Sequence, residues 1–286
     1  MERLGPWLAR LTWLALPLVA GPALGDALDG ASRPVQLVAS IGLWVGWAGV
    51  LVATLVPATV TLTVLRIAAP AAVAAAVAAT IAGGPSGADV AALVGTLLAA
   101  LATVAPFTVE AFVDGSSYGE ERRLPLRVPG VLALGPIPVV WALVVAGIVT
   151  GPLLLAARQW VAGAVALVVG ALAAWWGVRV LHTLARRWVV FVPAGLVVHD
   201  PLALVEPVLL RRGVVTALGP APADTRALDL TRGALGLALE VRLAEPVPLL
   251  VLRGRGRSET VTTGAMLITP SRPGALLTEA RDRRLA

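Results

Sequence analysis

The sequence predicts an α-helical membrane bundle of about six transmembrane helices, followed by a small antiparallel β domain with a C-terminal helix. The 286-residue chain is 58% hydrophobic and 14% charged, with a mean hydropathy of +0.86. Long apolar runs occupy residues 7–183, and about 20 apolar residues suffice for a helix to cross a bilayer. Beyond Arg186 the pattern changes to short runs rich in valine and leucine, which are typical of strands. We therefore place a transmembrane domain at residues 1–184 and a β domain at residues 185–286.

Each apolar run predicts one membrane helix. The first extends from about Trp7 to Leu24, and the small residues at its end also fit a cleaved signal peptide. We favour a retained helix because the apolar run is longer than the core of a typical signal peptide. The second helix is expected at about residues 35–56, and a turn near Pro57 to Arg66 precedes the third. The remaining helices are expected at about residues 67–83, 89–113, 131–155 and 161–181.

The distribution of arginines predicts how the helices are oriented. Basic side chains in short loops are retained on the cytoplasmic side of the membrane. With the spans above, one side has only Arg33 and Arg158. The other side collects Arg3, Arg10, Arg66, Arg122, Arg123, Arg127, Arg186 and Arg187. We therefore expect a multi-pass plasma-membrane protein with both termini in the cytoplasm.

Composition excludes several kinds of site. The chain has no cysteine and two histidines, so disulfides, thiolate sites and a multi-histidine metal centre are excluded. It contains no Gly-x-Ser-x-Gly elbow, His-Glu-x-x-His helix or P-loop, so we expect neither an enzyme nor a bound cofactor or metal. The net charge is +6, and because the arginines lie mostly beside membrane segments, we expect anionic lipid and no nucleic acid as their partner. Lysine and asparagine are absent, which indicates a GC-rich bacterial genome.

The C-terminal hundred residues predict a series of short strands. Trp188–Val192 and Leu196–His199 flank a turn at Pro193–Gly195, which is typical of a β-hairpin. Alternation of apolar and polar side chains predicts further strands, at about residues 207–211, 214–218, 226–230, 237–243, 248–252 and 265–269.

Two local patterns refine this domain. In residues 237–243, Ala238, Glu240 and Arg242 share one face of the strand and the larger apolar residues share the other. The chain closes with a helix to about residue 284, in which Pro273 fits the first turn and Ser271 is the expected N-cap. The β domain is therefore expected to bury one sheet face and to end in a helix.

Three segments carry a resemblance to a known family. They are Arg187–Val198, the Arg211–Arg212 pair before another strand, and Thr269–Leu277. Together with the order of elements, these segments make residues 187–277 resemble the bacterial pleckstrin-homology-like (PH-like) domains of membrane proteins, and the whole chain is similar to polytopic membrane proteins of actinobacterial-type bacteria. The resemblance implies a module for assembly or ligand contact, and it does not imply an enzyme.

Isolated polar residues in the apolar half are candidates for chemistry. Glu110, near the end of the fourth span, is a candidate intramembrane acid for a proton or cation pathway, because an acid is costly there unless it is paired or wetted. The alternative is that Glu110 and Asp114 lie at a helix end and are simply solvated. We expect Arg66 to extend to the interface, and His182 and His199 to have structural roles.

The charged loop between the fourth and fifth spans is the candidate ligand or lipid head-group site. Loops held on rigid elements often carry binding residues, and three guanidinium groups suit a phosphate. The alternative is that these arginines only set topology and contact head groups, with two glutamates offsetting them. The candidate residues are Tyr118, Glu120, Glu121, Arg122, Arg123 and Arg127.

These observations favour a non-enzymatic membrane protein that acts as a scaffold, regulator or assembly factor. Its expected partners are anionic lipid head groups at the cytoplasmic face and a protein bound through the PH-like domain. The alternative is a small transporter or channel that the β domain gates. Transporters usually show broken helices or polar residues at mid-membrane, and here the polar residues within the spans are scattered serines and threonines.

Overall fold

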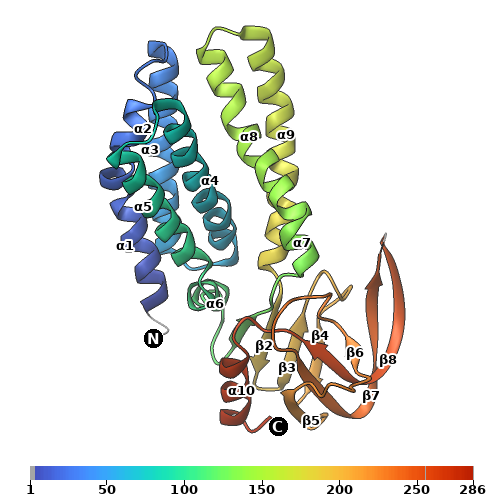
Figure 1. The fold of residues 1–286 in the computed structure, drawn as a ribbon. Coiled ribbons are helices and arrows are strands. Elements are labelled where there is room, and N and C mark those ends of the chain that lie inside the picture. The colour runs from blue at the N-terminus through green and yellow to red at the C-terminus, as the bar shows by residue number, and fades with distance from the viewer. Residues whose placement is uncertain (1–3, 255, 286) are drawn as a thin grey trace. The chain divides into compact units, whose positions relative to one another are not determined.

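The computed structural model describes residues 4–254 and 256–285. It divides the chain into two compact units, which Figure 1 shows as a set of long helices and a β domain. The helical unit comprises residues 4–115 and 138–182, and the β unit comprises residues 116–137 and 183–285. The two-part organisation expected from the sequence is therefore present, and the segment 116–137 lies in the β unit.

Long apolar helices dominate the first part of the chain. Five of them are long and apolar enough to cross a membrane, namely α3 (Arg33–Leu55), α4 (Thr59–Gly83), α5 (Gly87–Val104), α8 (Pro136–Ala156) and α9 (Trp160–Ala185). The first apolar segment instead forms α1 (Leu4–Val19) and α2 (Gly21–Asp26). With 16 residues, α1 is shorter than these five helices. By length and composition, these five helices are compatible with a multi-pass membrane protein.

The turn before the third span is shorter than expected. Helix α4 begins at Thr59, and the hydroxyl of Thr61 accepts a hydrogen bond from the backbone N–H of Ala58 at 3.0 Å. This contact satisfies one of the amide groups that every helix start leaves without a partner. Arg66 therefore lies inside the helix, and the prediction of a turn extending to Arg66 is wrong. A single charge did not mark a helix boundary, because a local cap already fixed the start of the helix.

Two predicted spans are each broken once. The fourth ends at Val104, and a separate short helix, α6 (Pro106–Asp114), follows it. Proline lacks a backbone N–H and is preferred at the first position of a helix, so Pro106 begins α6 and does not continue α5. In the fifth span, Gly135 separates α7 (Gly130–Leu134) from α8 and adopts φ −111° and ψ −95°. Both breaks lie near the ends of the apolar runs.

Helix α1 packs its buried face into the helical unit. Buried apolar residues recur at spacings of three or four from α1 into α2, which is one face of an α-helix, and they are Ala9, Trp13, Leu16, Ala20 and Ala23. Backbone hydrogen bonding continues from α1 into α2, since the Ala20 amide donates to Leu16 at 2.7 Å. A Cβ on Gly95 of α5 would lie 2.7 Å from Val19, so the two helices approach closely.

Helices α8 and α9 form an antiparallel pair that glycine allows to pack closely (Figure 1). A Cβ on Gly147 would lie 2.4 Å from the carbonyl oxygen of Gly170, and one on Gly151 would lie 2.6 Å from Cα of Leu167. Small residues allow such backbone approach between membrane helices. The Trp141 indole joins this pair to α4 by donating to the Ile67 carbonyl oxygen at 2.9 Å.

The β unit contains two four-stranded sheets and a C-terminal helix. The first sheet has the order β1 (Arg122–Pro125), β2 (Trp188–Val192), β3 (Gly195–His199) and β4 (Val208–Arg211), and all its pairs are antiparallel. The second has the order β5 (Val215–Pro220), β7 (Leu239–Arg253), β8 (Arg257–Ile268) and β6 (Leu228–Asp229). Only the short β6 pairs in parallel. The small antiparallel-rich domain expected from the sequence is confirmed.

Strand β1 comes from the charged loop between the fourth and fifth spans. It pairs with β2 in a register that places Leu124 opposite Val189 and Pro125 opposite Trp188. Leu124 and Leu126 are 2% and 7% exposed and belong to the core of the β domain. The β domain therefore begins before α8 and is completed after α9, whereas the sequence placed its start at residue 185.

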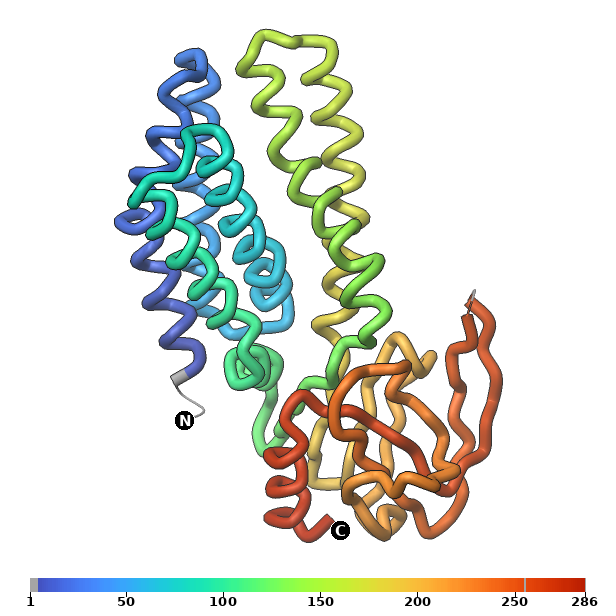
Figure 2. Tube along the Cα trace, viewed as in Figure 1, coloured from blue at the N-terminus to red at the C-terminus, as the bar shows by residue number. Residues whose placement is uncertain are grey.

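The longest strands form a hairpin that extends away from the rest of the β unit (Figure 2). Strand β7 covers two of the expected strands, and β8 extends the expected 265–269 segment back to Arg257. The register of β7 on β8 shifts between Arg242 and Val247, so a local irregularity lies where the sequence indicated a gap. Glu240 and Arg242 do share a face, as expected, and form an ion pair at 2.5 Å.

The C-terminal helix α10 (Pro273–Asp282) closes the core of the β domain. Leu276 and Ala280 are buried in the same apolar cluster as Phe191 and Leu196. The helix begins at Pro273, as expected, but its N-cap residue is Arg272, which makes no side-chain cap. The prediction of Ser271 as N-cap is therefore wrong by one residue, because the proline already occupies the first turn.

Candidate functional site

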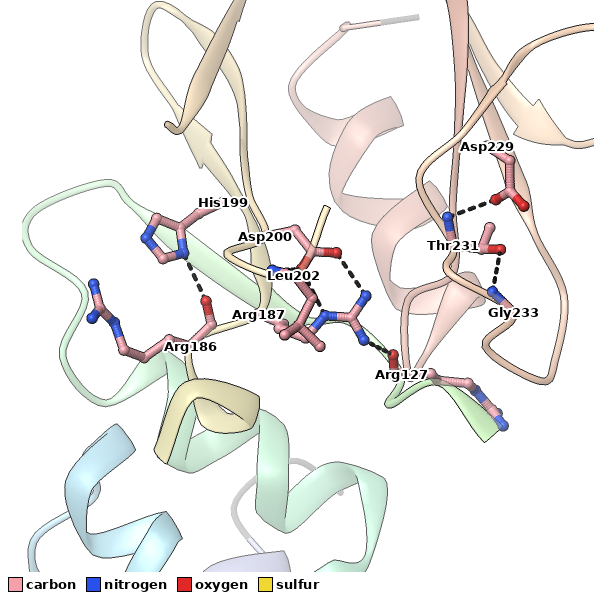
Figure 3. Close-up of polar contacts among 9 residues, drawn as sticks. All are labelled: Arg127, Arg186, Arg187, His199, Asp200, Leu202, Asp229, Thr231 and Gly233. Atoms are coloured by element: carbon pink, nitrogen blue, oxygen red, sulfur yellow. Dashed lines mark hydrogen bonds and ion pairs between the residues drawn. The ribbon is translucent and has the colours of Figure 1, made fainter. Parts of the chain in front are cut away.

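A buried ion pair fixes the point where the chain enters the β domain after α9 (Figure 3). The guanidinium of Arg187 donates to both carboxylate oxygens of Asp200, from Nε at 2.8 Å and from Nη2 at 2.6 Å. Both side chains are at most 1% exposed. Arg187 also donates to the carbonyl oxygen of Arg127, and Asp200 accepts the amide of Leu202 at 3.0 Å. These contacts tie β1, β2 and the end of β3 together.

An aromatic and basic stack lies next to this ion pair. The ring of His199 stacks on the indole of Trp188 with centroids 4.7 Å apart and planes 11° apart. The guanidinium of Arg123 lies over the same indole, 5.6 Å from its centroid. We call these three residues the Trp188 stack. They come from three neighbouring strands, and all are partly exposed.

The orientation of His199 is fixed by its backbone neighbour. Its Nδ1 lies 2.7 Å from the carbonyl oxygen of Arg186, as Figure 3 shows, so Nδ1 carries the hydrogen in this contact. This arrangement leaves Nε2 of His199 for a partner. A partly exposed indole in contact with a guanidinium and an imidazole suits a protein segment that offers an acidic group to Arg123 and a hydrogen-bond donor to Nε2 of His199.

The loop residues expected to form a head-group site are spread along β1 and the turn before it. Arg122 and Arg123 are consecutive strand residues, so their side chains lie on opposite faces of the sheet. Arg123 pairs with Glu121 at 3.1 Å, and Arg127 contacts the carbonyl oxygen of Ser271 at 3.5 Å beyond the far end of β1. The three arginines therefore do not converge on one phosphate.

The rest of the same loop has structural contacts. Tyr118 is 87% exposed, and its backbone N–H donates to the Glu121 carboxylate at 3.4 Å. The carbonyl oxygen of Glu120 accepts a hydrogen bond from Arg283 of the C-terminal segment at 2.6 Å. Of the expected loop residues, Arg123 is the one that the structure places in the Trp188 stack.

Glu110 lies in α6 and is 2% exposed. Glu110 therefore follows α5, the helix of the fourth span, and its side chain is buried in protein. Its neighbour Thr108 is also buried, and the Thr108 hydroxyl has no hydrogen-bond partner among the described residues. Helix α6 thus carries buried polar groups in the helical unit.

Helix α4 carries a second set of buried polar groups. The Thr63 hydroxyl lies 2.9 Å from Nδ1 of His182 in the last turn of α9. One turn later, the Nη1 atom of Arg66 is buried and has no hydrogen-bond partner in the described part of the chain. Nη1 is therefore enclosed by protein, while Arg66 as a whole is partly exposed. An ionisable group enclosed within a membrane helix is a functional candidate.

Sequence reasoning missed Arg187, Trp188 and Asp200. The signal was present, because a hairpin with its turn at 193–195 sets Trp188 opposite His199 and brings the flanking Arg187 and Asp200 close together. Among residues 4–254 and 256–285, no group of three or more carboxylate or histidine side chains is arranged to hold a metal ion.

No family model, no curated protein and no solved structure matches the chain.

Proposed function

We propose that the protein is a non-enzymatic, multi-pass plasma-membrane protein that acts as a scaffold, regulator or assembly factor. Its β domain is a PH-like module in the cytoplasm that binds a protein partner beside the bilayer. The observation that carries this proposal is the Trp188 stack, in which Arg123 and His199 flank a partly exposed indole. Tryptophan and arginine are the residues that most often dominate binding energy at protein interfaces.

The position of the stack supports a binding role. Trp188 follows the last residue of α9, Ala185, after two residues, so the stack lies close along the chain to a candidate membrane helix. The Arg187–Asp200 pair anchors the strands that carry it. Because packed strands hold these side chains in place before binding, the surface is preorganised and loses little conformational entropy when a partner binds.

The membrane part of the proposal includes a sixth span. Helices α1 and α2 together cover Leu4–Asp26, which at 1.5 Å per residue is about 34 Å and long enough to cross a bilayer core of about 30 Å. The buried face of α1 supports its place in the bundle. With six spans and the arginine distribution, both termini are cytoplasmic.

The PH-like assignment rests on the order and packing of elements. Two four-stranded sheets are followed by a single helix whose Leu276 enters their shared apolar core. This order agrees with the resemblance that the sequence carries. It supports an interaction module, since fold alone does not assign a chemical activity.

A photo-crosslinking experiment in cells tests the proposal. A photoreactive phenylalanine analogue at His199 is expected to capture a discrete protein, whereas the same group at the exposed Ser258 of the β7–β8 hairpin is not. Changing Trp188 to Ala, with the crosslinker at His199, is expected to remove the product, and Trp188→Phe is expected to retain part of it because an aromatic face remains. Equal products from His199 and Ser258 would contradict the proposal.

A second candidate function is a small transporter or channel gated by the β domain. The buried Nη1 of Arg66, which has no hydrogen-bond partner among the described residues, favours it, together with the Thr63–His182 contact in the helical unit. Proteoliposomes that contain the purified protein test this candidate. Ion or proton flux that is lost in Arg66→Met and kept in Arg158→Met, a change in the exposed loop before α9, would favour a transporter. Flux equal to that of empty liposomes favours the scaffold.

A further inference from the structure

Four exposed apolar side chains belong to two segments of the β unit that contact each other, and one of these segments leads along the chain into α8. Val131 and Leu134 of α7 are 80% and 86% exposed, and Leu235 and Leu237 of the loop after β6 are 71% and 50% exposed. We call these four residues the apolar rim. Clusters of exposed large apolar side chains on a soluble domain usually mark a binding surface or a membrane contact.

Direct contacts join the two segments of the rim. The Gly130 amide donates to the carbonyl oxygen of Gly233 at 3.2 Å, and Pro129 and Ala234 form an isolated antiparallel bridge. A Cβ on Gly130 would lie 3.3 Å from Cγ of Leu235. Leu235 therefore packs over the backbone at the start of α7.

The loop is held in this shape by its own turns. The amide of Thr231 donates to the Asp229 carboxylate at 2.7 Å, and the amide of Gly233 donates to the Thr231 hydroxyl at 3.3 Å, as Figure 3 shows. Gly233 and Gly236 have φ of 74° and 124°, values that favour glycine. The exposed leucines are thus presented on a defined backbone.

The chain connection from α7 to α8 indicates that the bilayer contacts the apolar rim. A single residue, Gly135, separates Leu134 from the first residue of this candidate membrane helix. The rim therefore lies where the chain enters the bilayer, and its apolar side chains match the boundary between head groups and acyl chains. Arg127 and Arg232 flank it, and their charges suit the anionic head groups at that depth.

We propose that the apolar rim of Val131, Leu134, Leu235 and Leu237 inserts into the head-group boundary of the bilayer that α8 enters, and so docks the β domain on the membrane. The inference rests on the proposed membrane location, and it holds for either candidate function. Insertion would hold the β domain at the lipid surface by burying apolar side chains. Salt screens interactions between charges but not this hydrophobic contribution.

Site-directed spin labelling of the full-length protein in nanodiscs tests the proposal. The chain has no cysteine, so single cysteines need no background removal. Labels replace Leu235 and Leu237, a matched exposed leucine of the β domain at Leu209, and a lipid-facing leucine of α8 at Leu143. Accessibility to dissolved oxygen, which concentrates in lipid, is compared with accessibility to a water-soluble nickel chelate.

We expect the ratio of oxygen to nickel accessibility at Leu235 and Leu237 to exceed that at Leu209 several-fold, in neutral as well as anionic nanodiscs and at high salt. Water accessibility at Leu235 and Leu237 equal to that at Leu209, with Leu143 in lipid, would overturn the inference and leave the membrane location intact. Water accessibility at Leu143 would instead overturn the membrane location. Strong spin coupling between Leu235 labels of two copies would assign the rim to self-association and also overturn the inference.

Discussion

Trp13 and Trp47 exchange hydrogen bonds between α1 and α3. The indole Nε1 of Trp13 donates to the carbonyl oxygen of Trp47, and the indole of Trp47 donates to the carbonyl oxygen of Trp13, each at 3.0 Å. Trp13 is 4% exposed. Each indole N–H, which would otherwise need a partner in an apolar environment, thus finds a carbonyl oxygen on the other helix, and the pair joins α1 to α3.

Loss of this pair is expected to weaken the helical unit. Changing Trp13 to Phe keeps an aromatic ring but removes the indole donor and some buried volume, so we expect a loss of at least about 1 kcal/mol, the scale of an interhelical hydrogen bond in a membrane. Thermal unfolding in detergent measures it. Trp44→Phe is the control, because Trp44 is 58% exposed. An equal fall in melting temperature for both variants would contradict the account.

Removing one partner of the Arg187–Asp200 pair is expected to destabilise the β domain strongly. Asp200→Ala leaves a buried guanidinium without its counter-charge, a change that typically costs about 3–5 kcal/mol. The double variant Arg187→Met with Asp200→Leu removes both charges and is expected to be more stable than Asp200→Ala. Chemical denaturation of the full-length protein, followed by near-ultraviolet circular dichroism, ranks the three proteins. A double variant less stable than Asp200→Ala would contradict this reasoning.

Strand β1 is expected to be required for a stable isolated β domain. Residues 183–286 alone lack Leu124 and Leu126, and burying a leucine stabilises a fold by roughly 1.5–3 kcal/mol. The Leu126 amide donates to Arg187 at 3.0 Å, so the end of β1 lies beside the start of β2. We consider a fusion in which a short glycine–serine linker joins residues 116–129 to residues 183–286. This fusion should unfold at a higher temperature than residues 183–286 alone.

A matched variant makes this comparison specific. Leu124→Asp in the fusion places a charge in the core and is expected to remove the gain, whereas Tyr118→Ser at an exposed position is not. Equal melting temperatures for the fusion and the fragment would show that β1 contributes nothing to the domain.

The Glu240 cluster gives the β domain a pH dependence. Arg242 and Thr225 donate to the Glu240 carboxylate at 2.5 Å each, and these hydrogen bonds lower the pKa of Glu240 in the folded state. Because the pKa of Glu240 is lower in the folded state than in the unfolded state, where it is about 4.3, the ionised carboxylate stabilises the fold at pH values above about 4.3. This stability is lost as the pH falls through the pKa of the folded state. Glu240→Gln is therefore expected to be less stable than the unchanged protein at pH 7.

As the pH falls below the unfolded value and through the lowered folded pKa of Glu240, the two proteins are expected to approach equal stability, since Glu240 becomes protonated. Urea denaturation of the full-length protein at several pH values measures the difference. Glu259→Gln serves as the control, because the Glu259–Arg253 ion pair is more than half exposed and contributes little. If the difference in unfolding free energy between Glu240→Gln and the unchanged protein did not vary with pH, ionised Glu240 would not be the source of the pH dependence.

The sequence predicts the long elements well and the long-range pairings poorly. Apolar runs such as those in α3, α8 and α9 are sufficient to identify membrane-length helices, because the bilayer core sets their length. Strand β1 is four residues in a charged loop, and its partner β2 lies more than 60 residues later. The periodicity of a short segment carries no information about a partner that far along the chain. The sequence therefore did not predict β1, nor that residues before α8 and residues after α9 form one β domain.

Glycines illustrate the same limit in the membrane helices. Gly42, Gly46 and Gly49 have the spacing of a helix contact in the sequence, yet a Cβ on any of them would meet nothing within 4 Å. Gly147 and Gly170 instead make the close approach between α8 and α9. The sequence shows where small residues occur, but only the packed structure shows which face of a helix contacts a neighbouring helix. The Trp188 stack was missed for a related reason, since it requires three strands in register.

The side of the membrane that holds the β domain is the central claim, and labelling of single cysteines tests it most directly. Pro85→Cys lies in the exposed turn between α4 and α5, and Ser258→Cys lies in the exposed β7–β8 hairpin. With a membrane-impermeant maleimide on intact cells, we expect labelling at Pro85→Cys only, and labelling at Ser258→Cys after the membrane is permeabilised. Labelling of Ser258→Cys in intact cells would place the β domain outside the cytoplasm and contradict the account.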